Sequence, residues 1–356
     1  MADDFASVLI AWQRSAGRHD LPWQNTRDPY RIWLSEIMLQ QTQVAAVIPY
    51  YLRFLEHFPD VASLAAAPAD TVMHLWAGLG YYSRARNLHA CAKKIVAEFG
   101  GRFPADPAVI ATLPGIGRST AAAIAAFAWG ARAAILDGNV KRVLCRAFAI
   151  DGYPGERAVE QRLWQLADRL LPADTADLPA YTQGLMDLGA TLCKPRNPTC
   201  LLCPLSTRCQ ALAQGKVESL PTTKVRAPLP ERAVAMLVLR HREAVLLEKR
   251  PPQGIWGGLW SLPELSLPGA LDLEDEVRTW ARGFGAIATV TRGAPFVHGF
   301  THYRLHVQPV IVTLRRRAAQ LADAAGAQRW MEPDEVAAAG LPAPVRKLLM
   351  QEAAQP

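Results

Sequence analysis

The chain has 356 residues, of which 50% are hydrophobic and 20% charged, and it carries a formal net charge of +7. This length exceeds that of a usual single domain, so two domains are expected. The positive charge favours a polyanionic partner over a membrane. No apolar run approaches transmembrane length, and the N-terminal residues lack the pattern of a secretory signal. The sequence therefore predicts a cytoplasmic protein without a membrane partner.

The first long helical pattern contains a carboxyl group in unusual surroundings. Asp28-Pro29 predicts a helix start, and the pattern runs on through residues 30–51, with a break expected before Pro49. Glu36 lies inside it, among apolar and amide side chains at helical spacing. Such surroundings raise the pKa of a carboxyl group, which suits a general acid. A structural glutamate bonded to backbone is the commoner meaning of such a residue taken alone.

A glycine turn, GLGYYSRARNL, interrupts the next helical patterns. It is expected to expose Tyr81, Tyr82, Arg84 and Arg86. Tyrosines on a turn beside arginines suit a wedge that stacks on DNA bases and a clamp for phosphate. Tyrosines that close a small core are the more frequent case.

The sequence LPGIG opens a stretch that joins a turn to a second carboxylate. Gly115 and Gly117 permit backbone angles closed to other residues, so that peptide N–H groups can face a phosphate. A close-packing helix is predicted over residues 119–129. Asp137 precedes a further helix that is expected to begin at Asn139. A helix-turn-helix within a core, with Asp137 only as its N-cap, explains these features equally well.

Four of the six cysteines are packed into one short loop, at Cys193, Cys200, Cys203 and Cys209. Their number and closeness predict a metal cluster in a reducing compartment, and four thiolates are enough to hold a [4Fe–4S] cluster. Zinc is the alternative, but zinc ribbons usually have two CxxC pairs, and this loop has one. The intervening sequence KPRNP would present cations to phosphate.

The pattern changes to strands near residue 232, which predicts a second domain of the α+β class. A proline-rich stretch before it reads as a linker. The predicted domains are residues 1–217, with the cysteine loop 193–209, then the linker 218–231 and the second domain 232–356. In the second domain we expect strands near residues 286–291 and 303–314, and helices at 273–284 and 345–351.

In combination, these motifs resemble the adenine DNA glycosylases of the helix-hairpin-helix superfamily. The resemblance rests on SEIMLQQTQV, GLGYYSRARNL, LPGIGRSTAAAI, LDGNVKRVL and the four-cysteine loop, and it covers nearly the whole chain. It implies an all-α helix-hairpin-helix glycosylase domain with an iron–sulfur cluster loop, followed by an α+β Nudix-like domain. It also implies a [4Fe–4S] cofactor and a monomer.

The resemblance further implies excision of adenine paired with 8-oxoguanine or guanine in double-stranded DNA. Glu36 resembles the acid that protonates adenine at N7, and Asp137 the carboxylate that stabilises the cationic sugar. Asn139 would orient Asp137. The remaining implied contacts with DNA are at Gln40, Tyr81, Arg84, Gly115, Gly117, Ser119 and Lys141, and the lesion would be read by Phe300, Thr301 and His302.

Ser119 stands where the related endonuclease III carries the lysine that cuts the backbone, which argues for a glycosylase without lyase activity. Lys141, close after Asp137, retains the chemistry for a slow Schiff base. The family's Phe-Ser-His loop has Thr301 at its centre here. The second domain lacks the glutamate-rich helix of a pyrophosphohydrolase and is interpreted as a binding module. The alternatives are an endonuclease III-like glycosylase and lyase, or a non-catalytic DNA-binding protein.

Overall fold

The computed structural model describes residues 2–224, 228–267, 273–318 and 327–353. The chain forms two compact units, each described below by itself. The first consists of Met1–Ala66 and Asn87–Val225, and the second of Ala67–Arg86 and Arg226–Pro356. The domain boundaries expected from the sequence remain a prediction, and linker residues 225–227 lie outside the described residues.

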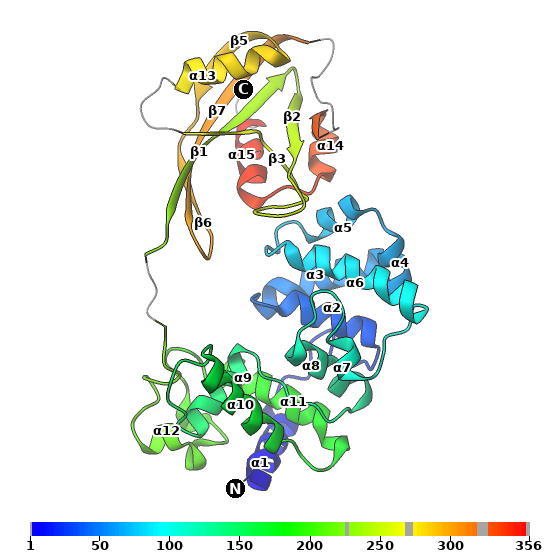
Figure 1. The fold of residues 1–356 in the computed structure, drawn as a ribbon, viewed down its shortest axis with the longest axis vertical. Helices are drawn as coiled ribbons and strands as arrows, with labels where there is room; N and C mark the ends of the chain where they lie inside the picture. The colour runs from blue at the N-terminus through cyan, green and yellow to red at the C-terminus, as the bar shows by residue number, and fades with distance from the viewer. Residues whose placement is uncertain (1, 225–227, 268–272, 319–326, 354–356) are drawn as a thin grey trace. The chain divides into compact units, whose positions relative to one another are not determined.

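The first unit is built from helices (Figure 1). Its α-helices are α1 (Ala2–Ala16), α2 (Pro29–Leu39), α3 (Val44–His57), α4 (Val61–Ala66), most of α6 (Ser83–Phe99), α7 (Pro107–Ile110), α8 (Arg118–Trp129), α9 (Gly138–Ala147), α10 (Arg157–Arg169), α11 (Leu178–Asp187) and α12 (Gln210–Ala213). The short 3₁₀ helices are η1 (Thr175–Asp177), η3 (Cys200–Leu202) and η4 (Ser206–Arg208), and η2 (Leu188–Leu192) is a π-helix. The all-α character expected of this half is confirmed.

Helix α2 begins where the sequence predicted. The Asp28 carboxylate accepts the Tyr30 N–H at 2.9 Å, and proline occupies the first helical position. The expected break before Pro49 is wrong, because Pro49 lies inside α3. The chain leaves the helix earlier, where Gln41 takes a left-handed φ of 57°. Loss of the single hydrogen bond that Pro49 cannot donate is therefore tolerated within α3.

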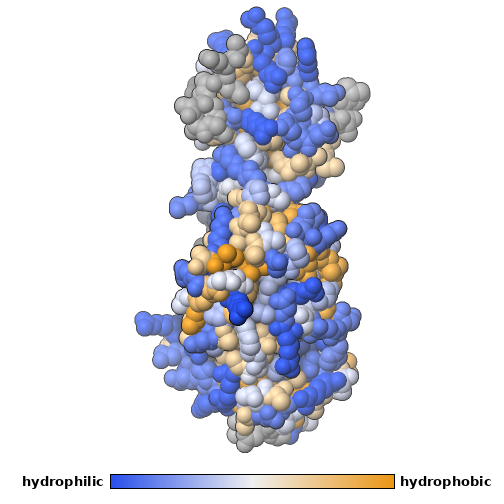
Figure 2. Space-filling model, turned by 90° about the vertical axis from the view of Figure 1, so that its right-hand side faces the viewer, coloured by the Kyte–Doolittle hydropathy of each residue, from blue (hydrophilic) through white to orange (hydrophobic). Residues whose placement is uncertain are grey.

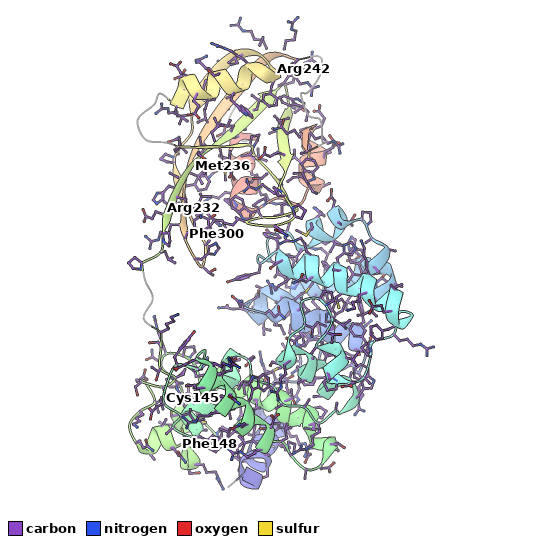
Figure 3. The ribbon with its side chains drawn as sticks, in the orientation of Figure 1. Cys145, Phe148, Arg232, Met236, Arg242 and Phe300 are labelled. Atoms are coloured by element: carbon purple, nitrogen blue, oxygen red, sulfur yellow. The ribbon has the colours of Figure 1, made fainter. Side chains whose placement is uncertain are left out.

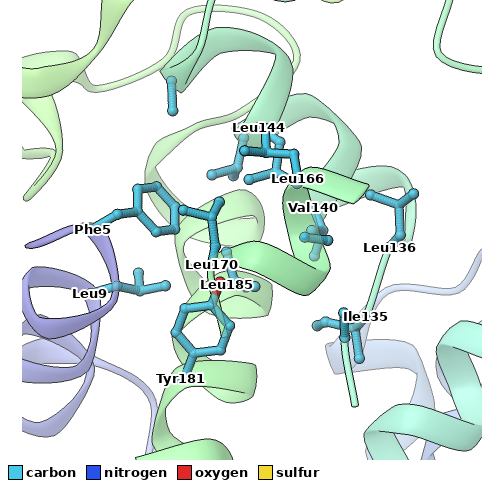
Figure 4. Close-up of a cluster of buried hydrophobic side chains, with 14 of the residues drawn as sticks. Phe5, Leu9, Ile135, Leu136, Val140, Leu144, Leu166, Leu170, Tyr181 and Leu185 are labelled. Carbon is cyan, nitrogen blue, oxygen red and sulfur yellow. The ribbon is translucent and has the colours of Figure 1, made fainter. Parts of the chain in front are cut away.

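One hydrophobic core of the first unit gathers side chains from α1, α9, α10 and α11. Figure 4 shows Phe5 and Leu9 of α1 close to Leu144 of α9 and Leu185 of α11. Burial of each such side chain is worth about 1.5–3 kcal/mol. Helix α9 is thus held firmly along its apolar side, and so is the residue that precedes it, Asp137.

The second unit contains a mixed sheet. Its strands are β1 (Glu231–His241), β2 (Ala244–Lys249), β3 (Trp260–Ser261), β4 (Glu264–Ser266), β5 (Gly285–Arg292), β6 (Phe296–Gly299), β7 (Arg304–Arg317) and β8 (Gln328–Met331). The main order is β3-β2-β1-β7-β5, with β1 and β7 parallel and β5 and β6 antiparallel to β7. Helices α5 (Ala69–Trp76), α13 (Leu273–Ala281), α14 (Pro333–Ala338) and α15 (Ala343–Ala353) complete it with the 3₁₀ helix η5 (Arg282–Phe284).

Both faces of the central strand β1 are covered. Leu237 and Leu239 form a core with Val277 of α13, while the alternate residues Met236 and Val238 are also buried. This burial explains why β1 is apolar at almost every position and not at alternate ones. The strands expected from about residue 232 and near residues 286–291 and 303–314 are confirmed as β1, β5 and β7, and the two expected helices as α13 and α15. Strand β8 and helix α14 were not foreseen.

Hydrophilic side chains cover much of the face drawn in Figure 2. Among the described residues, no helix combines the length and apolar character needed to cross a membrane.

Candidate active site

A cleft of about 1340 Å³ opens in the first unit, and both predicted catalytic carboxyl groups line it. Glu36 reaches it from the end of α2, and Asp137 from the start of α9. The structure therefore brings together two residues that lie far apart in the sequence. Four other residues expected at the site also line the cleft, namely Gln40, Gly117, Ser119 and Asn139.

The carboxyl group of Glu36 is only partly exposed, toward the cleft. Burial raises the pKa of Glu36 to about 8, with a further contribution from the negative charge of Asp137. Glu36 thus retains its proton at neutral pH. A protonated carboxyl group facing a cleft of this size can donate that proton to a bound base.

Asp137 is the N-cap of α9, and its Oδ1 accepts the Val140 N–H at 2.8 Å. Burial raises the pKa of Asp137, while the N–H groups of Val140 and Asn139 and the charges of Arg142 and Lys141 act in the opposite direction. These donors and cations support the ionised form directly, and Glu36 has no such cause favouring its ionised form. Hydrogen bonds and cations thus favour the ionised form of Asp137, whereas burial and the charge of Asp137 both favour the protonated form of Glu36.

Ser119 supports the segment that carries Asp137. Its Oγ accepts the backbone N–H of Leu136 at 2.9 Å, which ties the first turn of α8 to the residue before the catalytic carboxylate. The hydroxyl group thus has a structural partner inside the site. In the sequence, Ser119 was notable only because it replaces a lysine, and no sequence pattern indicated this hydrogen bond.

The two glycines of the hairpin differ from each other. Gly115 has a φ of 77°, and a Cβ there would lie 2.7 Å from the Cβ of Asn87, so no larger residue fits. Gly117 is the N-cap of α8 with a φ of −92°, an angle open to any residue, and a Cβ there would meet no atom within 4 Å. The expectation that Gly117 needs special backbone angles is wrong. Its position leaves the N-terminus of α8 open at the cleft.

Lys141 does not line the cleft. Its Nζ lies 2.6 Å from Oε1 of Glu160 on α10, and its side chain is 21% exposed. This ion pair directs the amine toward α10. The predicted contact of Lys141 with DNA is untested by this arrangement.

Tyr81 and Arg84 lie in the second unit, Tyr81 on the turn between α5 and α6 and Arg84 in the first turn of α6. Arg84 is buried, at 7% exposure, so the prediction that it is exposed is wrong. Its guanidinium donates to the Gly80 carbonyl at 3.2 Å and lies 5.3 Å from the rings of Trp76 and of Tyr81. The turn closes around the guanidinium and leaves the Tyr81 side chain outside, where Tyr81 is 41% exposed. The backbone of Tyr81 has a φ of 48°.

The four clustered cysteines gather in the first unit and are not joined by disulfides. The pKa of the Cys203 thiol is raised to about 11, mainly by burial and to a smaller extent by the neighbouring thiols of Cys193, Cys209 and Cys200. Among the described residues, no group of three or more His, Cys, Asp or Glu side chains is arranged to hold a metal ion.

Two arginines of α9, not foreseen from the sequence, connect the cleft to the cysteine loop. Arg142 donates to Oδ1 of Asn139 at 2.8 Å and to the Gly189 and Cys193 carbonyls, each at 2.7 Å. Arg146 lies 3.5 Å from Sγ of Cys193. Residues 139, 142 and 146 share one face of α9, but this spacing alone does not indicate the contact with the distant cysteine loop.

Gly189 belongs to the π-helix η2 and allows this close approach. A Cβ on Gly189 would lie 2.6 Å from the Cβ of Asn139. Isolated π-helical turns are often found at functional sites. Here the turn brings the backbone of the segment before Cys193 directly against the start of α9.

The predicted lesion-reading residues occupy the tip of the β6–β7 hairpin in the second unit, where Figure 3 labels Phe300. Thr301 and His302 are exposed. The Phe300 ring stacks on Tyr303 at 4.6 Å between centroids and lies 5.4 Å from the ring of Trp256. The hairpin tip therefore combines aromatic rings that support Phe300 with two exposed polar side chains, Thr301 and His302.

Two family models match separate parts of the chain. Residues 34–169 match the HhH-GPD superfamily of base excision DNA repair proteins, and residues 234–351 match the NUDIX domain. A thermostable thymine-DNA glycosylase of known structure is 31% identical, with a TM-score of 0.55 over 60% of this chain and 97% of its own. Endonuclease III in complex with DNA, 21% identical with a TM-score of 0.51, shares the fold of the same portion.

Relatives that align with almost the whole chain indicate its family within this superfamily. The adenine DNA glycosylase of Buchnera aphidicola from Acyrthosiphon pisum is 35% identical over 97% of this chain and 96% of its own length. The adenine DNA glycosylase of Homo sapiens is 34% identical over 97% of this chain and 73% of its own. With its two carboxyl groups in one cleft and its two matched domains, the chain belongs to the adenine DNA glycosylases, base-excision repair enzymes that act on DNA.

Proposed function

We propose that this enzyme removes adenine paired with 8-oxoguanine or guanine and leaves an abasic site. The observation that carries the proposal is the pair of carboxyl groups in one cleft, with Glu36 protonated at neutral pH and Asp137 supported as an anion. Departure of adenine needs an acid for the leaving base and a negative charge beside the sugar. The two residues supply one function each.

In the proposed reaction Glu36 donates its proton to N7 of the flipped adenine. The bond between C1′ and N9 then breaks, and its electron pair leaves with the base. Asp137 stabilises the positive charge that develops on the sugar. Asn139 orients Asp137 and is itself held by the hydrogen bond that Arg142 donates to it. Water adds to C1′ and returns a proton to the Glu36 carboxylate, which restores the acid. Adenine and an abasic site are the products.

Contacts with the duplex are assigned to residues around this cleft and to the second unit. The open N-terminus of α8, with Gly115 and Gly117 before it, offers backbone N–H groups to a phosphate. Gln40 and the exposed ring of Tyr81 would fill the space that the flipped base leaves. Thr301 and His302 would contact the 8-oxoguanine strand, together with the supported ring of Phe300.

We assign a [4Fe–4S] cluster to Cys193, Cys200, Cys203 and Cys209. Four free thiols of one loop, flanked by the Arg146 guanidinium, form a donor set suited to it. The cluster would fix the loop that presents Lys194 and Arg196 to DNA. Anaerobic purification should yield about four iron and about four sulfide per chain; stoichiometric zinc would refute the assignment.

The proposed enzyme releases the base without cutting the backbone. Ser119 cannot form a Schiff base, and its hydroxyl accepts a backbone N–H. Lys141 is paired with Glu160. We further propose that the enzyme acts as a monomer in the compartment that holds the DNA.

A panel of duplexes tests this function. The protein is incubated with 8-oxoguanine:adenine, guanine:adenine, 8-oxoguanine:cytosine and thymine-glycol duplexes, and each product is analysed with and without alkali. We expect adenine release from the first two and strand cutting only after alkali. Efficient cutting of the thymine-glycol duplex without alkali would instead indicate an endonuclease III-like lyase.

A further inference from the structure

The second unit contains both the Tyr81 turn and the hairpin that carries Thr301 and His302, although the Tyr81 turn comes from the helical half of the sequence. One hydrogen bond connects the Tyr81 turn to the segment that contains Gly257, which lies next to the hairpin through Trp256. Arg86, in the first turn of α6, donates from Nη1 to the Gly257 carbonyl at 2.6 Å. Its own backbone N–H donates to the Tyr82 carbonyl at 3.2 Å, so Arg86 is anchored to the tyrosine turn.

The Gly257 end of this bond belongs to a tightly constrained turn. A Cβ on Gly257 would lie 2.5 Å from the Pro252 carbonyl oxygen, and the next residue, Gly258, has a φ of 78° and packs against the Arg86 stem. The preceding residue, Trp256, is itself held at a φ of 54°. A turn with this geometry has little freedom to move without its neighbours.

Trp256 completes the connection. Its buried ring lies 5.8 Å from the His298 ring and 5.4 Å from the Phe300 ring, measured between centroids. Phe300 is the residue immediately before Thr301 and His302. A continuous series of contacts therefore runs from the tyrosine turn through Arg86 and the Gly257 carbonyl to Trp256 and the hairpin tip.

We propose that Arg86 is a positioning residue that transmits lesion contact at the hairpin to the Tyr81 wedge, and so contributes to discrimination between 8-oxoguanine and guanine opposite adenine. The inference rests on the proposed function, in which the hairpin reads the lesion and Tyr81 enters the base stack. Because one series of contacts connects the hairpin with the Tyr81 turn, an 8-oxoguanine bound at the hairpin fixes the position of the Tyr81 wedge. A guanine makes weaker contact with the hairpin, and the Tyr81 wedge is then less precisely positioned.

Other contacts hold α5 to the rest of the second unit without Arg86. Lys249 pairs with Asp70, and His74 lies 3.5 Å from the Ala339 carbonyl. Removal of Arg86 should therefore leave this segment in place and loosen only the path from the wedge to the hairpin. This separates a positioning role from a purely structural one.

The test compares kcat/KM for 8-oxoguanine:adenine and guanine:adenine duplexes in the full-length protein. In Arg86→Met, which keeps the aliphatic stem and loses the donor, the ratio of the two values should fall by roughly 5- to 20-fold. Arg86→Lys, which keeps a charged donor, should recover part of the ratio. Arg315→Met, at an exposed arginine at the other end of β7, is the matched control and should keep the ratio within about twofold.

A double-mutant cycle with Thr301→Ala completes the design. If Arg86 acts through the hairpin, the double variant should show about the ratio of the more impaired single variant, not the product of both losses. Equal losses on both duplexes in Arg86→Met, or strictly additive effects, would overturn the proposal and leave the proposed function intact. An unchanged ratio in a Thr301→Ala, His302→Ala variant would count against lesion reading by the hairpin, and so against the proposed function. If Arg86→Met lowers the Tm sharply, the same comparison is made with Arg86→Lys.

Discussion

The negative charge of Asp137 acts on the carboxyl group of Glu36 across the cleft and helps burial to keep it protonated. The relationship is unequal, because Asp137 accepts the Val140 N–H, and the positive charges of Arg142 and Lys141 also favour its ionised form. One cleft thus holds a protonated carboxyl group beside a second one whose ionised form has direct support. The proposed chemistry of adenine removal follows from this inequality.

Asp137→Asn should remove the anion while preserving the helix, because asparagine is as good an N-cap as aspartate. We expect single-turnover adenine release to fall by about 10²–10³-fold. The pKa of Glu36 should also decrease, since the charge that helps to raise it is gone, so any residual activity should be lost at a lower pH. A Tm close to that of the wild type would show that the lower rate comes from the missing charge and not from partial unfolding.

Glu36→Gln should stabilise the folded protein at alkaline pH. In the folded state the pKa of Glu36 is about 8, against an ordinary value of 4.5, so between these pH values unfolding releases a proton. The wild-type free energy of unfolding should therefore fall relative to that of Glu36→Gln as the pH rises from 4.5 to 8, by roughly 2–4 kcal/mol. Urea unfolding at pH 5 and pH 8 measures the difference, and a gap independent of pH would contradict it.

Ser119→Ala should leave the Leu136 N–H without its acceptor and release the segment before Asp137. We expect a loss of about 1–2 kcal/mol in stability and a decrease of roughly tenfold in the rate of adenine release. Thr112→Ala, which removes a hydroxyl from an exposed turn, serves as the control and should leave the rate unchanged. Unaltered catalysis in Ser119→Ala would show that the hydroxyl has no positioning role.

Arg142→Met should break three hydrogen bonds at once, to Asn139 and to the Gly189 and Cys193 carbonyls. Because the Gly189 acceptor is buried and the other two are partly buried, we expect a loss of about 2–4 kcal/mol together with lower activity and lower iron content. Arg162→Met, at an exposed arginine of α10, should change none of these. The free energy of unfolding, the iron content and the rate of adenine release are measured on the same preparations. This comparison shows whether the three quantities decrease together.

Local patterns were sufficient to predict much of the fold. Asp28 and Pro29 predicted the start of α2, and the change to a strand pattern near residue 232 predicted β1, which begins at Glu231. The break after α2 was misplaced at Pro49, because a proline in the second turn of a helix removes only one hydrogen bond, whereas the left-handed angle at Gln41 leaves no mark in composition. Short elements such as β8 depend on their partners and carry little periodicity of their own.

The site was predictable as a set of residues, but not as a network. Glu36 and Asp137 were singled out by their neighbours in sequence. The burial of Arg84 was missed, because an arginine beside tyrosines on a glycine turn reads as exposed until the turn is seen to close around it. The roles of Arg142 and Gly189 depend on contact between α9 and a distant π-helix, which no local pattern encodes.

The central claim is that Glu36 acts as the acid, and a pH–rate profile tests it most directly. Single-turnover adenine release from an 8-oxoguanine:adenine duplex is measured between pH 5.5 and pH 9.5 for the wild type and for Glu36→Gln. The account predicts a wild-type rate that declines as the pH rises through about 8, and a Glu36→Gln variant that binds the duplex but releases almost no adenine at any pH. Wild-type rates in Glu36→Gln, or an unchanged alkaline decline in that variant, would contradict the assignment.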